Sequence, residues 1–345
     1  MISIGGRQHG VGAEFDDDGD GTLWRLLELM DGSRTEQEII DQLIGERPAL
    51  DRESLGAALK TLIEAGYVED AAASPPPTLS AEELARYDRS LNYFAWVDMM
   101  PRQSRYELQA RLKAGSVTVC GLGGTGSAVA AALVAAGVGA VHCVDHDRVE
   151  AGNLTRQLLY TEDDIGAPKV EVAVARLRTS NRYVEVTGEE RLVGGERDLA
   201  ELMAGRDLFV LAADEPRETI VTWANAAALT TSTPWLIAQY AGPTAVTGLF
   251  VPGVTGCYAC LPLVSELFEN GRTLFDWQGH AVLAPTANLA GHLAALEAIY
   301  FLVGMQPSSL GRVFHLSLTD FSHNYFVGPR TDVDCEICGR RRESP

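Results

Sequence analysis

A glycine-rich loop in the middle of the chain limits the possible folds more than any other feature. The loop reads Gly121-Leu-Gly-Gly-Thr-Gly126, follows an apolar run at 117–120 and precedes a helical pattern at 127–136. In a G-x-G-x-x-G loop, the first glycine allows a tight turn, the second lets a phosphate approach the backbone, and the third lets the helix pack on the strand. We therefore expect a nucleotide at a helix N-terminus; the alternative is a tight turn without a ligand. The glycines concerned are Gly121, Gly123, Gly124 and Gly126.

Short apolar strands alternate with helices around this loop, an order typical of a parallel, doubly wound sheet. Predicted strands cover residues 117–120, 140–144, 184–187 and 208–212, and predicted helices cover 127–136 and 169–177. Later in the chain, a helix is expected over 287–302 and a strand over 312–318. The fold class is thus α/β, with a Rossmann-like domain expected over residues 80–345.

A small separate domain is predicted for residues 1–70, followed by a proline-rich linker at 71–79. Apolar residues at helical spacing predict helices over 22–30, 36–44 and 54–66, with strands at 1–4 and 67–69. Thr35 and Glu38 have the spacing of a capping box for the second helix. Three helices with flanking strands are a winged-helix (α+β) pattern. The acidic run at 16–20 is interpreted as a solvated loop.

Charge excludes some partners. The chain has a net charge of −19, and residues 1–70 alone hold 6 basic and 16 acidic side chains. Such a surface repels the phosphates of nucleic acid and of anionic membranes, so a DNA-binding winged helix is disfavoured. The sequence contains neither an apolar run of membrane-spanning length nor a basic-then-apolar leader, so we expect a cytoplasmic protein that contacts no membrane.

Four cysteines form two matched Cys-x-x-Cys pairs near the end of the chain. Each pair can occupy two positions of a tetrahedral zinc site, and 74 residues separate the pairs. A closed four-thiolate site has no open position for a substrate, so the zinc is expected to be structural; the alternative is four reduced thiols. The expected ligands are Cys257, Cys260, Cys335 and Cys338.

Polar side chains after the glycine loop favour ATP over a dinucleotide. Asp145 ends the second predicted strand, where an acidic side chain reaches a ribose hydroxyl. Adenylation builds charge on the α-phosphate and on departing pyrophosphate, and clustered donors stabilise that charge. The expected donors are Asn153, Arg156 and Lys169. The alternatives are a strand-end cap for Asp145 and surface charges for the cations.

From about residue 85 to residue 340 the chain resembles the ThiF/MoeB adenylating family, relatives of ubiquitin-activating enzymes. The shared motifs are the GxGGxG loop, the segment from Asp145 and Asp147 to Asn153-Leu-Thr-Arg156-Gln157, a Pro-Lys pair ending at Lys169, an aspartate after a central strand, and both cysteine pairs. The resemblance implies ATP and Mg²⁺ as cofactors, with Asp147 and Gln157 in the nucleotide site and Asp214 binding magnesium. It also implies a homodimer in which Arg89 reaches the nucleotide of the neighbouring subunit.

Two departures from the family pattern concern the substrate. No cysteine lies between residues 260 and 335, so a thioester on the crossover loop is not expected. The loop Glu266–His280 instead contains Phe268, Phe275 and Trp277. Glu215 follows Asp214, where the family often has asparagine. The expected product is an acyl-adenylate that another nucleophile attacks.

Residues 22–70 resemble PqqD-like peptide-recognition domains, which bind leader peptides of ribosomally made natural products. Together with the adenylating domain, this is similar to the peptide-modifying branch that contains the microcin C adenylating enzyme. We therefore expect ATP-dependent adenylation of a carboxylate on a ribosomal precursor peptide. The alternatives are activation of a ubiquitin-like sulfur carrier, a non-catalytic partner that presents the leader peptide, and a purely structural N-terminal domain.

Overall fold

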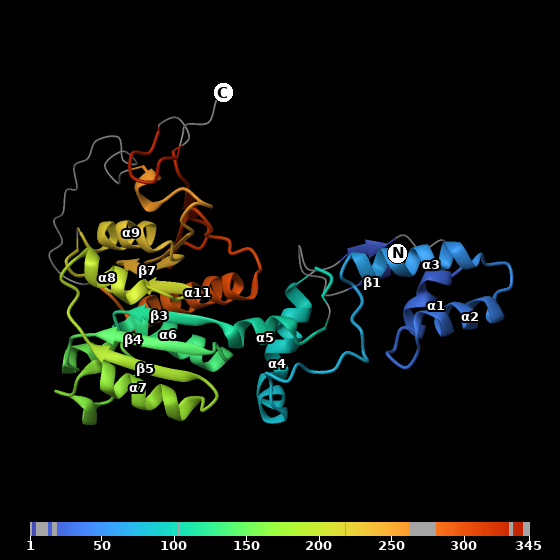
Figure 1. Ribbon diagram of the computed structural model, residues 1–345, viewed down its shortest axis with the longest axis horizontal. Coiled ribbons are helices and arrows are strands. Elements are labelled where there is room, and N and C mark those ends of the chain that lie inside the picture. Colours follow the sequence, from blue (N-terminus) through green and yellow to red (C-terminus); the bar gives the residue numbers. More distant parts are fainter. Residues whose placement is uncertain are drawn as a thin grey trace. The chain divides into compact units, whose positions relative to one another are not determined.

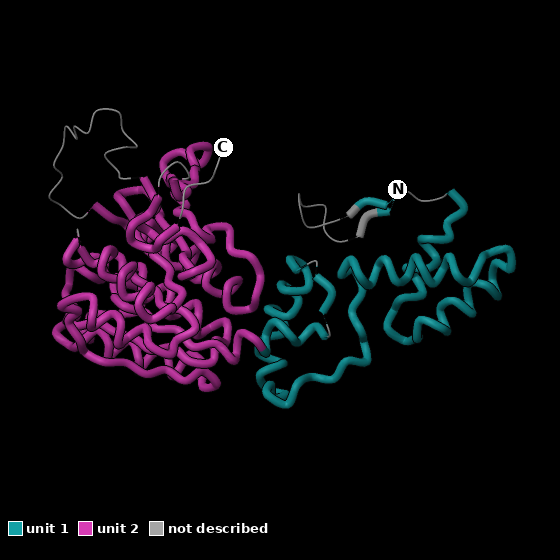
Figure 2. The backbone as a smooth tube through the Cα atoms, turned by 45° about the horizontal axis from the view of Figure 1, so that its top comes forward, with its two compact units in different colours: residues 1–110 teal, residues 111–345 magenta. Residues whose placement is uncertain are grey.

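The chain divides after Ala110 into two units, residues 1–110 and 111–345 (Figure 2). The computed structural model describes residues 2–4, 13–15, 19–98, 100–102, 104–217, 219–262, 281–330 and 334–340. The predicted loop Glu266–His280 and acidic residues 16–18 lie outside these ranges. The expected domain boundary at 71–79 stays a prediction.

Three helices of the N-terminal unit share one hydrophobic core (Figure 1). They are α1 (Thr22–Leu29), α2 (Glu36–Glu46) and α3 (Arg52–Glu64). The core consists of leucines and isoleucines at helical spacing: Leu26, Leu29, Ile39, Ile40, Leu43, Leu55, Leu59 and Leu62. The capping box of α2 is present, because Thr35 accepts from the amide of Glu38 and Glu38 accepts from that of Thr35. Local capping and apolar spacing thus produce these helices, as predicted.

One strand of this unit was predicted and another was not: β1 (Ile2–Ile4) corresponds to the strand expected at 1–4, whereas β2 (Ala13–Phe15) was not expected. β1 pairs antiparallel with β2. The expected strand at 67–69 does not form. Tyr67 instead packs edge-on against Phe15, with ring centroids 5.5 Å apart, and its side chain joins the helical core. Side-chain packing here overrides local strand propensity. The unit continues with α4 (Ala81–Val97), which begins at a Ser80–Glu83 capping box.

An eight-stranded sheet forms the centre of the C-terminal unit, with strand order β10-β9-β8-β7-β6-β3-β4-β5. Strands β7, β6, β3, β4 and β5 are parallel, whereas β8, β9 and β10 add antiparallel pairs at one edge. The alternating pattern predicted the parallel part of the sheet, whereas the antiparallel pairs at this edge were not predicted. The strands are β3 (Ser116–Cys120), β4 (Ala140–Asp145), β5 (Glu185–Glu190), β6 (Leu208–Leu211), β7 (Trp235–Ala241), β8 (Thr244–Phe250), β9 (Val313–Ser317) and β10 (Asn324–Val327).

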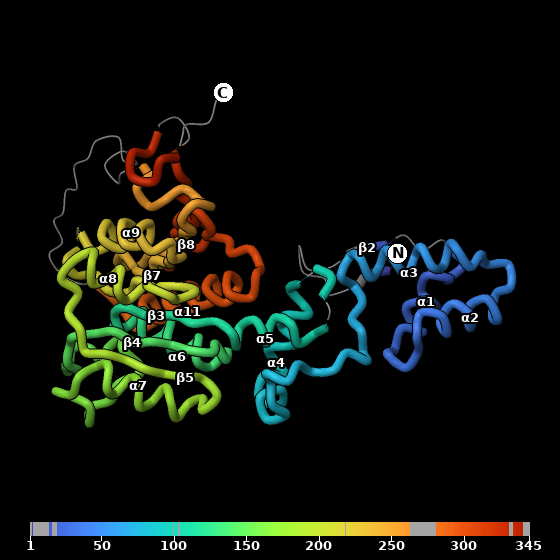
Figure 3. Tube along the Cα trace, viewed as in Figure 1, coloured from blue at the N-terminus to red at the C-terminus, as the bar shows by residue number. Residues whose placement is uncertain are grey.

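Helices cover both faces of the sheet. α6 and α7 contact each other, as do α6 and α11, whereas α8 and α9 form a separate contacting pair. Their bounds are α6 (Gly124–Ala136), α7 (Lys169–Ser180), α8 (Glu196–Met203), α9 (Ile220–Thr231) and α11 (Ala284–Val303), and α5 (Glu107–Ala114) precedes β3. After α11 the chain returns to the sheet and places β9 beside β8 (Figure 3).

α11 is the one helix in the described part of the chain that is long and apolar enough to cross a membrane. It packs against α6, β7 and β8, and half of its apolar window is buried inside the fold. Its buried Glu297 accepts hydrogen bonds from the amides of Ser308 and Ser309 at 3.1 and 2.6 Å. These contacts are those of a core helix.

Candidate active site

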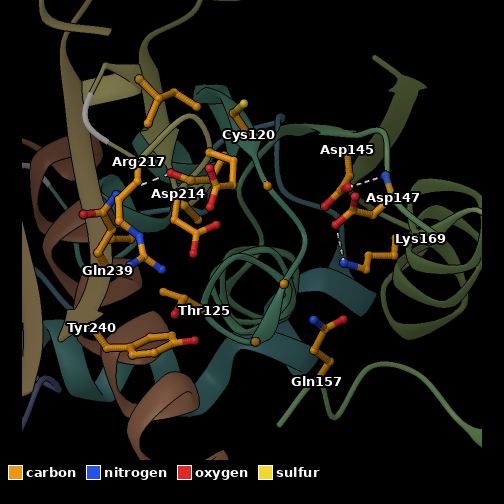
Figure 4. A pocket seen from close by; sticks show the side chains of 18 of the residues that line it. Cys120, Thr125, Asp145, Asp147, Gln157, Lys169, Asp214, Arg217, Gln239 and Tyr240 are labelled. Carbon is orange, nitrogen blue, oxygen red and sulfur yellow. Dashed lines mark hydrogen bonds and ion pairs between the residues drawn. The ribbon is translucent and has the colours of Figure 1, made fainter. Parts of the chain in front are cut away.

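A cavity of about 600 Å³ lies at the carboxyl ends of β4, β3, β6 and β7, around the start of α6 (Figure 4). In open α/β sheets, ligands bind at this edge where the strand connections diverge, and pockets of about 300–1,000 Å³ are typical. Many of the residues predicted from the sequence line the cavity: Gly121, Gly123, Gly124, Asp145, Asp147, Asn153, Arg156, Gln157, Lys169 and Asp214. Their individual roles stay predictions.

The glycine loop has the close approaches that require glycine. Gly121 has a φ of +90°, and a Cβ there would lie 2.5 Å from the backbone nitrogen of Ala213. A Cβ on Gly126 would overlap the carbonyl oxygen of Gly121. α6 begins at Gly124 without a side-chain cap, so its first amides have no side-chain acceptor among the described residues. The start of α6 therefore offers unpaired amides to an anion in the cavity.

Two buried polar atoms at the cavity have no hydrogen-bond partner among the described residues: Oγ1 of Thr125 and Oε1 of Gln157. Both residues are nearly fully buried, with 4% and 2% exposure. An unpaired buried polar group costs about 1–3 kcal/mol, so a polar ligand at these atoms would be stabilising. The phosphates and hydroxyls of a nucleotide suit this requirement. The sequence analysis missed Thr125, because the loop was interpreted through its glycines.

Asp145, at the end of β4, is held by backbone amides on both sides. Its Oδ2 accepts from the amide of Leu122 at 2.6 Å, and its Oδ1 accepts from the amide of Asp147 at 2.8 Å. The residue is 8% exposed and lines the cavity. The carboxylate thus fixes the glycine loop against β4.

The segment from the end of β4 to the first residue of α7 supplies the cations. Nζ of Lys169 lies 2.8 Å from Oδ2 of Asp147. Nη1 of Arg156 donates to the carbonyl of Gly152 at 3.1 Å. Asn153 is buried, and its Oδ1 accepts from the amide of Glu150 at 3.1 Å. Lys169 thus lies on the β4 side of the cavity, whereas Arg156 also interacts with Tyr240 at the end of β7.

The other side of the cavity is formed after β6 and at the end of β7 (Figure 4). Asp214 follows β6, and Nε2 of Gln239 on β7 donates to the carbonyl of Ala213 at 3.3 Å, which ties that loop to the sheet. Burial raises the pKa of Tyr240, and Asp214 adds to the rise, while Arg156 and Arg217 oppose it. Gln239, Tyr240 and Arg217 were not predicted, because no local pattern marks them.

Arg89 belongs to α4 of the N-terminal unit. Its side chain is 93% exposed, and its nearest ion pair joins Nη1 to Asp88 at 3.8 Å. The contact expected with a neighbouring subunit stays a prediction.

The four predicted cysteines form one cluster. The Sγ atoms of Cys257 and Cys260 are 3.9 Å apart, those of Cys257 and Cys335 are 3.9 Å apart, and those of Cys260 and Cys338 are 3.5 Å apart. A zinc–sulfur bond of about 2.3 Å places tetrahedral sulfurs about 3.8 Å apart, so the spacing fits a four-thiolate zinc site. All four sulfurs lie within 4.8 Å of one another.

The cluster is anchored to the core of the C-terminal unit. The amide of Tyr258 donates to Oδ1 of Asn225 on α9 at 2.8 Å, and its ring packs against Trp235 and Phe250. Burial raises the pKa of Cys257 to about 11. Burial also acts to raise the pKa of Cys338, but backbone hydrogen bonds from Arg340 and Cys257 outweigh it and bring the value to about 7. A metal ion would hold all four as thiolates.

Comparison with known proteins agrees with this geometry. Residues 97–337 match the ThiF family. A sulfur carrier protein adenylyltransferase of Thermus thermophilus is 36% identical over 275 residues, which are 75% of this chain and 92% of the relative. The sulfur carrier protein ThiS adenylyltransferase of Bacillus subtilis is 33% identical over 253 residues, or 70% of this chain and 73% of the relative.

A solved structure is similar over a longer part of the chain. The crystal structure of E. coli MccB superposes with a TM-score of 0.79 at 23% identity, covering 100% of this chain and 95% of that one. The same protein with AMPCPP and MccA gives a TM-score of 0.75 at 24% identity, covering 96% and 94%. At this identity the likeness shows a shared fold, including the N-terminal unit.

Proposed function

This chain belongs to the ThiF family, and on that premise we propose that it is an ATP-dependent adenylyltransferase that activates a carboxylate on a ribosomally synthesised precursor peptide. The observation that carries the proposal is the division of one cavity into two sides. The start of α6, Asp145 and Lys169 lie on the β4 side, and Asp214 lies on the β6 side. ATP on the first side would present its α-phosphate to a carboxylate on the second.

The reaction needs no protein nucleophile. A carboxylate oxygen of the substrate attacks the α-phosphorus, the bond from that phosphorus to the bridging β-phosphate oxygen breaks, and pyrophosphate leaves with the electron pair. Since the attacking group is already ionised, no proton has to move. What the chain contributes is position and charge: Arg156, Lys169 and the amides of α6 would stabilise the phosphates.

Each proposed cofactor has residues of suitable chemistry. The unpaired Thr125 and Gln157 atoms suit the polar groups of ATP. Asp214 offers a carboxylate oxygen, the ligand type that Mg²⁺ prefers, and magnesium there would supply neutralising charge. The four-cysteine cluster suits a structural Zn²⁺. Four reduced thiolates on zinc are compatible with a cytoplasmic enzyme.

A peptide substrate is favoured by two features. The likeness to MccB, whose structure has been solved with MccA, extends over the N-terminal unit, whereas the two sulfur-carrier relatives described above align with 70% and 75% of this chain. No cysteine lies between residues 260 and 335 to accept a thioester. We propose that residues 1–70 form a winged-helix, PqqD-like domain that binds the leader, and that residues 71–79 link it to the enzyme.

Docking of the leader would raise the effective concentration of the core peptide at the active site. We further propose a homodimer in which Arg89 of one subunit approaches the nucleotide of the other; its high exposure is compatible with such a contact. The acidic surface of residues 1–70 supports a peptide rather than a nucleic acid as the partner.

Activation of a sulfur carrier is the second candidate, because relatives with that name are 33–36% identical. ATP–pyrophosphate exchange separates the two. The purified chain is tested with synthetic peptides encoded by short reading frames beside its gene, and with a carrier protein ending in Gly-Gly. Peptide-dependent exchange supports the first function, and carrier-dependent exchange supports the second. Tight peptide binding without any exchange would instead favour a leader-presenting partner.

A further inference from the structure

One positively charged side chain that lines the cavity, Arg217, is not among the residues proposed to bind the nucleotide. Lys169 pairs with Asp147, and Arg191 pairs with Glu189, Asp198 and Glu201. Arg156 donates to the carbonyl of Gly152 and also interacts with the hydroxyl group of Tyr240. Arg217 also lines the cavity, but it forms neither a hydrogen bond nor an ion pair with any residue in the described ranges. Arg217 is exposed.

The position of Arg217 separates it from the nucleotide side. It follows Asp214 in the loop after β6, whereas Asp145 ends β4, and β3 lies between β6 and β4 in the sheet. Figure 4 shows Arg217, Gln239 and Tyr240 on one side of α6 and Asp145, Asp147 and Lys169 on the other. With ATP placed as proposed above, Arg217 lies on the side of the cavity assigned to the reacting carboxylate.

The local charge explains why a cation is needed there. Asp214 and Glu215 lie in the same loop and line the same cavity, and Glu215, which has no proposed metal to neutralise it, repels an incoming carboxylate. A guanidinium offers paired donors that match a carboxylate, and it stays charged at every physiological pH.

We propose that Arg217 binds a second carboxylate of the substrate, so that the residue activated by this enzyme belongs to an acidic segment, with one carboxylate adenylated and another paired with Arg217. This inference rests on the proposed function, and it names the substrate class: an aspartate- or glutamate-containing peptide end. Arg217 is a specificity residue in this scheme, and nucleotide binding does not depend on it.

Calorimetry with stable adenylate analogues tests the inference without a leader peptide. Three probes are used: 5′-O-sulfamoyladenosine, its N-acetylglutamyl derivative with a free side-chain carboxylate, and the matched N-acetylglutaminyl derivative. The wild type should prefer the glutamyl probe over the glutaminyl probe by about tenfold, the value of one charge-assisted contact. Arg217→Ala should remove this preference and leave the affinity for sulfamoyladenosine unchanged. Arg217→Lys should retain part of the preference.

Arg197→Ala is the matched control, since Arg197 is 92% exposed and pairs with Glu201 on its own helix. It should behave as the wild type with all three probes. Equal affinities of the wild type for the glutamyl and glutaminyl probes would overturn the inference. So would a loss of sulfamoyladenosine affinity in Arg217→Ala, because Arg217 would then belong to the nucleotide side.

The proposed function is tested by a different measurement, peptide-dependent pyrophosphate exchange. Peptide-dependent pyrophosphate exchange with no preference between acidic and amidated peptides would keep peptide adenylation and reject the role of Arg217. A glutamyl preference that depends on Arg217, without exchange on any peptide, would keep the carboxylate subsite and reject peptide adenylation.

Discussion

Nζ of Lys169, the first residue of α7, lies 2.8 Å from Oδ2 of Asp147, two residues beyond β4. The lysine side chain is 6% exposed, whereas the aspartate side chain is 52% exposed. Within the described residues, the buried ammonium therefore has one half-exposed carboxylate as its counter-charge. A phosphate in the cavity would add a second negative partner.

Asp147→Asn should lower the free energy of unfolding by about 1 kcal/mol, because the lysine loses its counter-charge in a partly solvated pair. ATP should then stabilise this variant more than the wild type, since phosphate restores the missing charge. Lys169→Met should lose most of the stabilisation by ATP. The stabilisation by ATP is measured as the difference between the melting temperatures with and without ATP, for the wild type and for both variants. Lys60→Met is the control, because Lys60 forms an exposed ion pair with Glu64. If ATP stabilised Lys169→Met as much as the wild type, Lys169 would have no part in binding the phosphates.

Asp214→Ala should reduce pyrophosphate exchange by at least about a hundredfold, because its carboxylate would position magnesium and the reacting phosphate. The melting temperature should stay within a few degrees, since Asp214 is exposed. Asp163→Ala, an exposed acid on the short helix Glu162–Asp164, should keep full activity. Exchange at the wild-type rate in Asp214→Ala would show that the aspartate has no part in the chemistry.

Purified protein should contain one zinc ion per chain, measured by elemental analysis. Cys257→Ser and Cys338→Ser should each lower the zinc content and the melting temperature, because each removes one of four ligands and frees the C-terminal segment from the core. Cys143→Ala is the matched control, since this buried cysteine lies on β4 outside the cluster. Full zinc content in both serine variants would refute the four-cysteine site.

The two buried strand thiols predict a loss of stability at alkaline pH. Burial raises the pKa of Cys120 and of Cys143 to about 12, whereas an unfolded thiol titrates near about 8.5. Between these values the unfolded chain loses protons that the folded chain keeps, so stability falls as pH rises, by about 1.4 kcal/mol per pH unit for each thiol. Below about pH 8 the effect vanishes.

Urea unfolding at about pH 8 and about pH 10 measures this dependence. Between these two pH values, the free energy of unfolding of Cys143→Ala should fall by about 2 kcal/mol less than that of the wild type. Val141→Ala, a buried change on the same strand without an ionisable group, should lower stability equally at both pH values. An unchanged pH dependence in Cys143→Ala would show that this thiol ionises in the folded protein as it does in the unfolded chain.

Local patterns were sufficient for the elements that build the nucleotide side of the cavity. The strand at 117–120, the glycine loop and the following helix were predicted because apolar alternation, glycine spacing and helical periodicity are all local. The structure starts that helix at Gly124, three residues earlier than the apolar pattern, since the glycines themselves form its first turn. The predicted helix at 169–177 likewise corresponds to α7.

Long-range pairing was beyond these patterns. Thr244 of β8 pairs with Ser317 of β9, and this contact joins segments separated by the whole of α11. The antiparallel edge of the sheet was therefore not predicted. Tyr67 shows the opposite error: its local strand propensity was a poor guide, because packing against Phe15 was available.

By itself, the sequence determined the family motifs, the glycine loop and the paired cysteines, because backbone conformation and metal-ligand spacing depend on residue type and short separations. Only the tertiary structure decided which side chains share the cavity. The cavity is lined both by Asp145 and Lys169 and by Arg217, Gln239 and Tyr240. These residues share it because β7, β6, β3 and β4 are neighbours in the sheet and their carboxyl ends lie at the same edge. Strand order results from the burial of whole faces of the sheet, and no short segment of sequence encodes it.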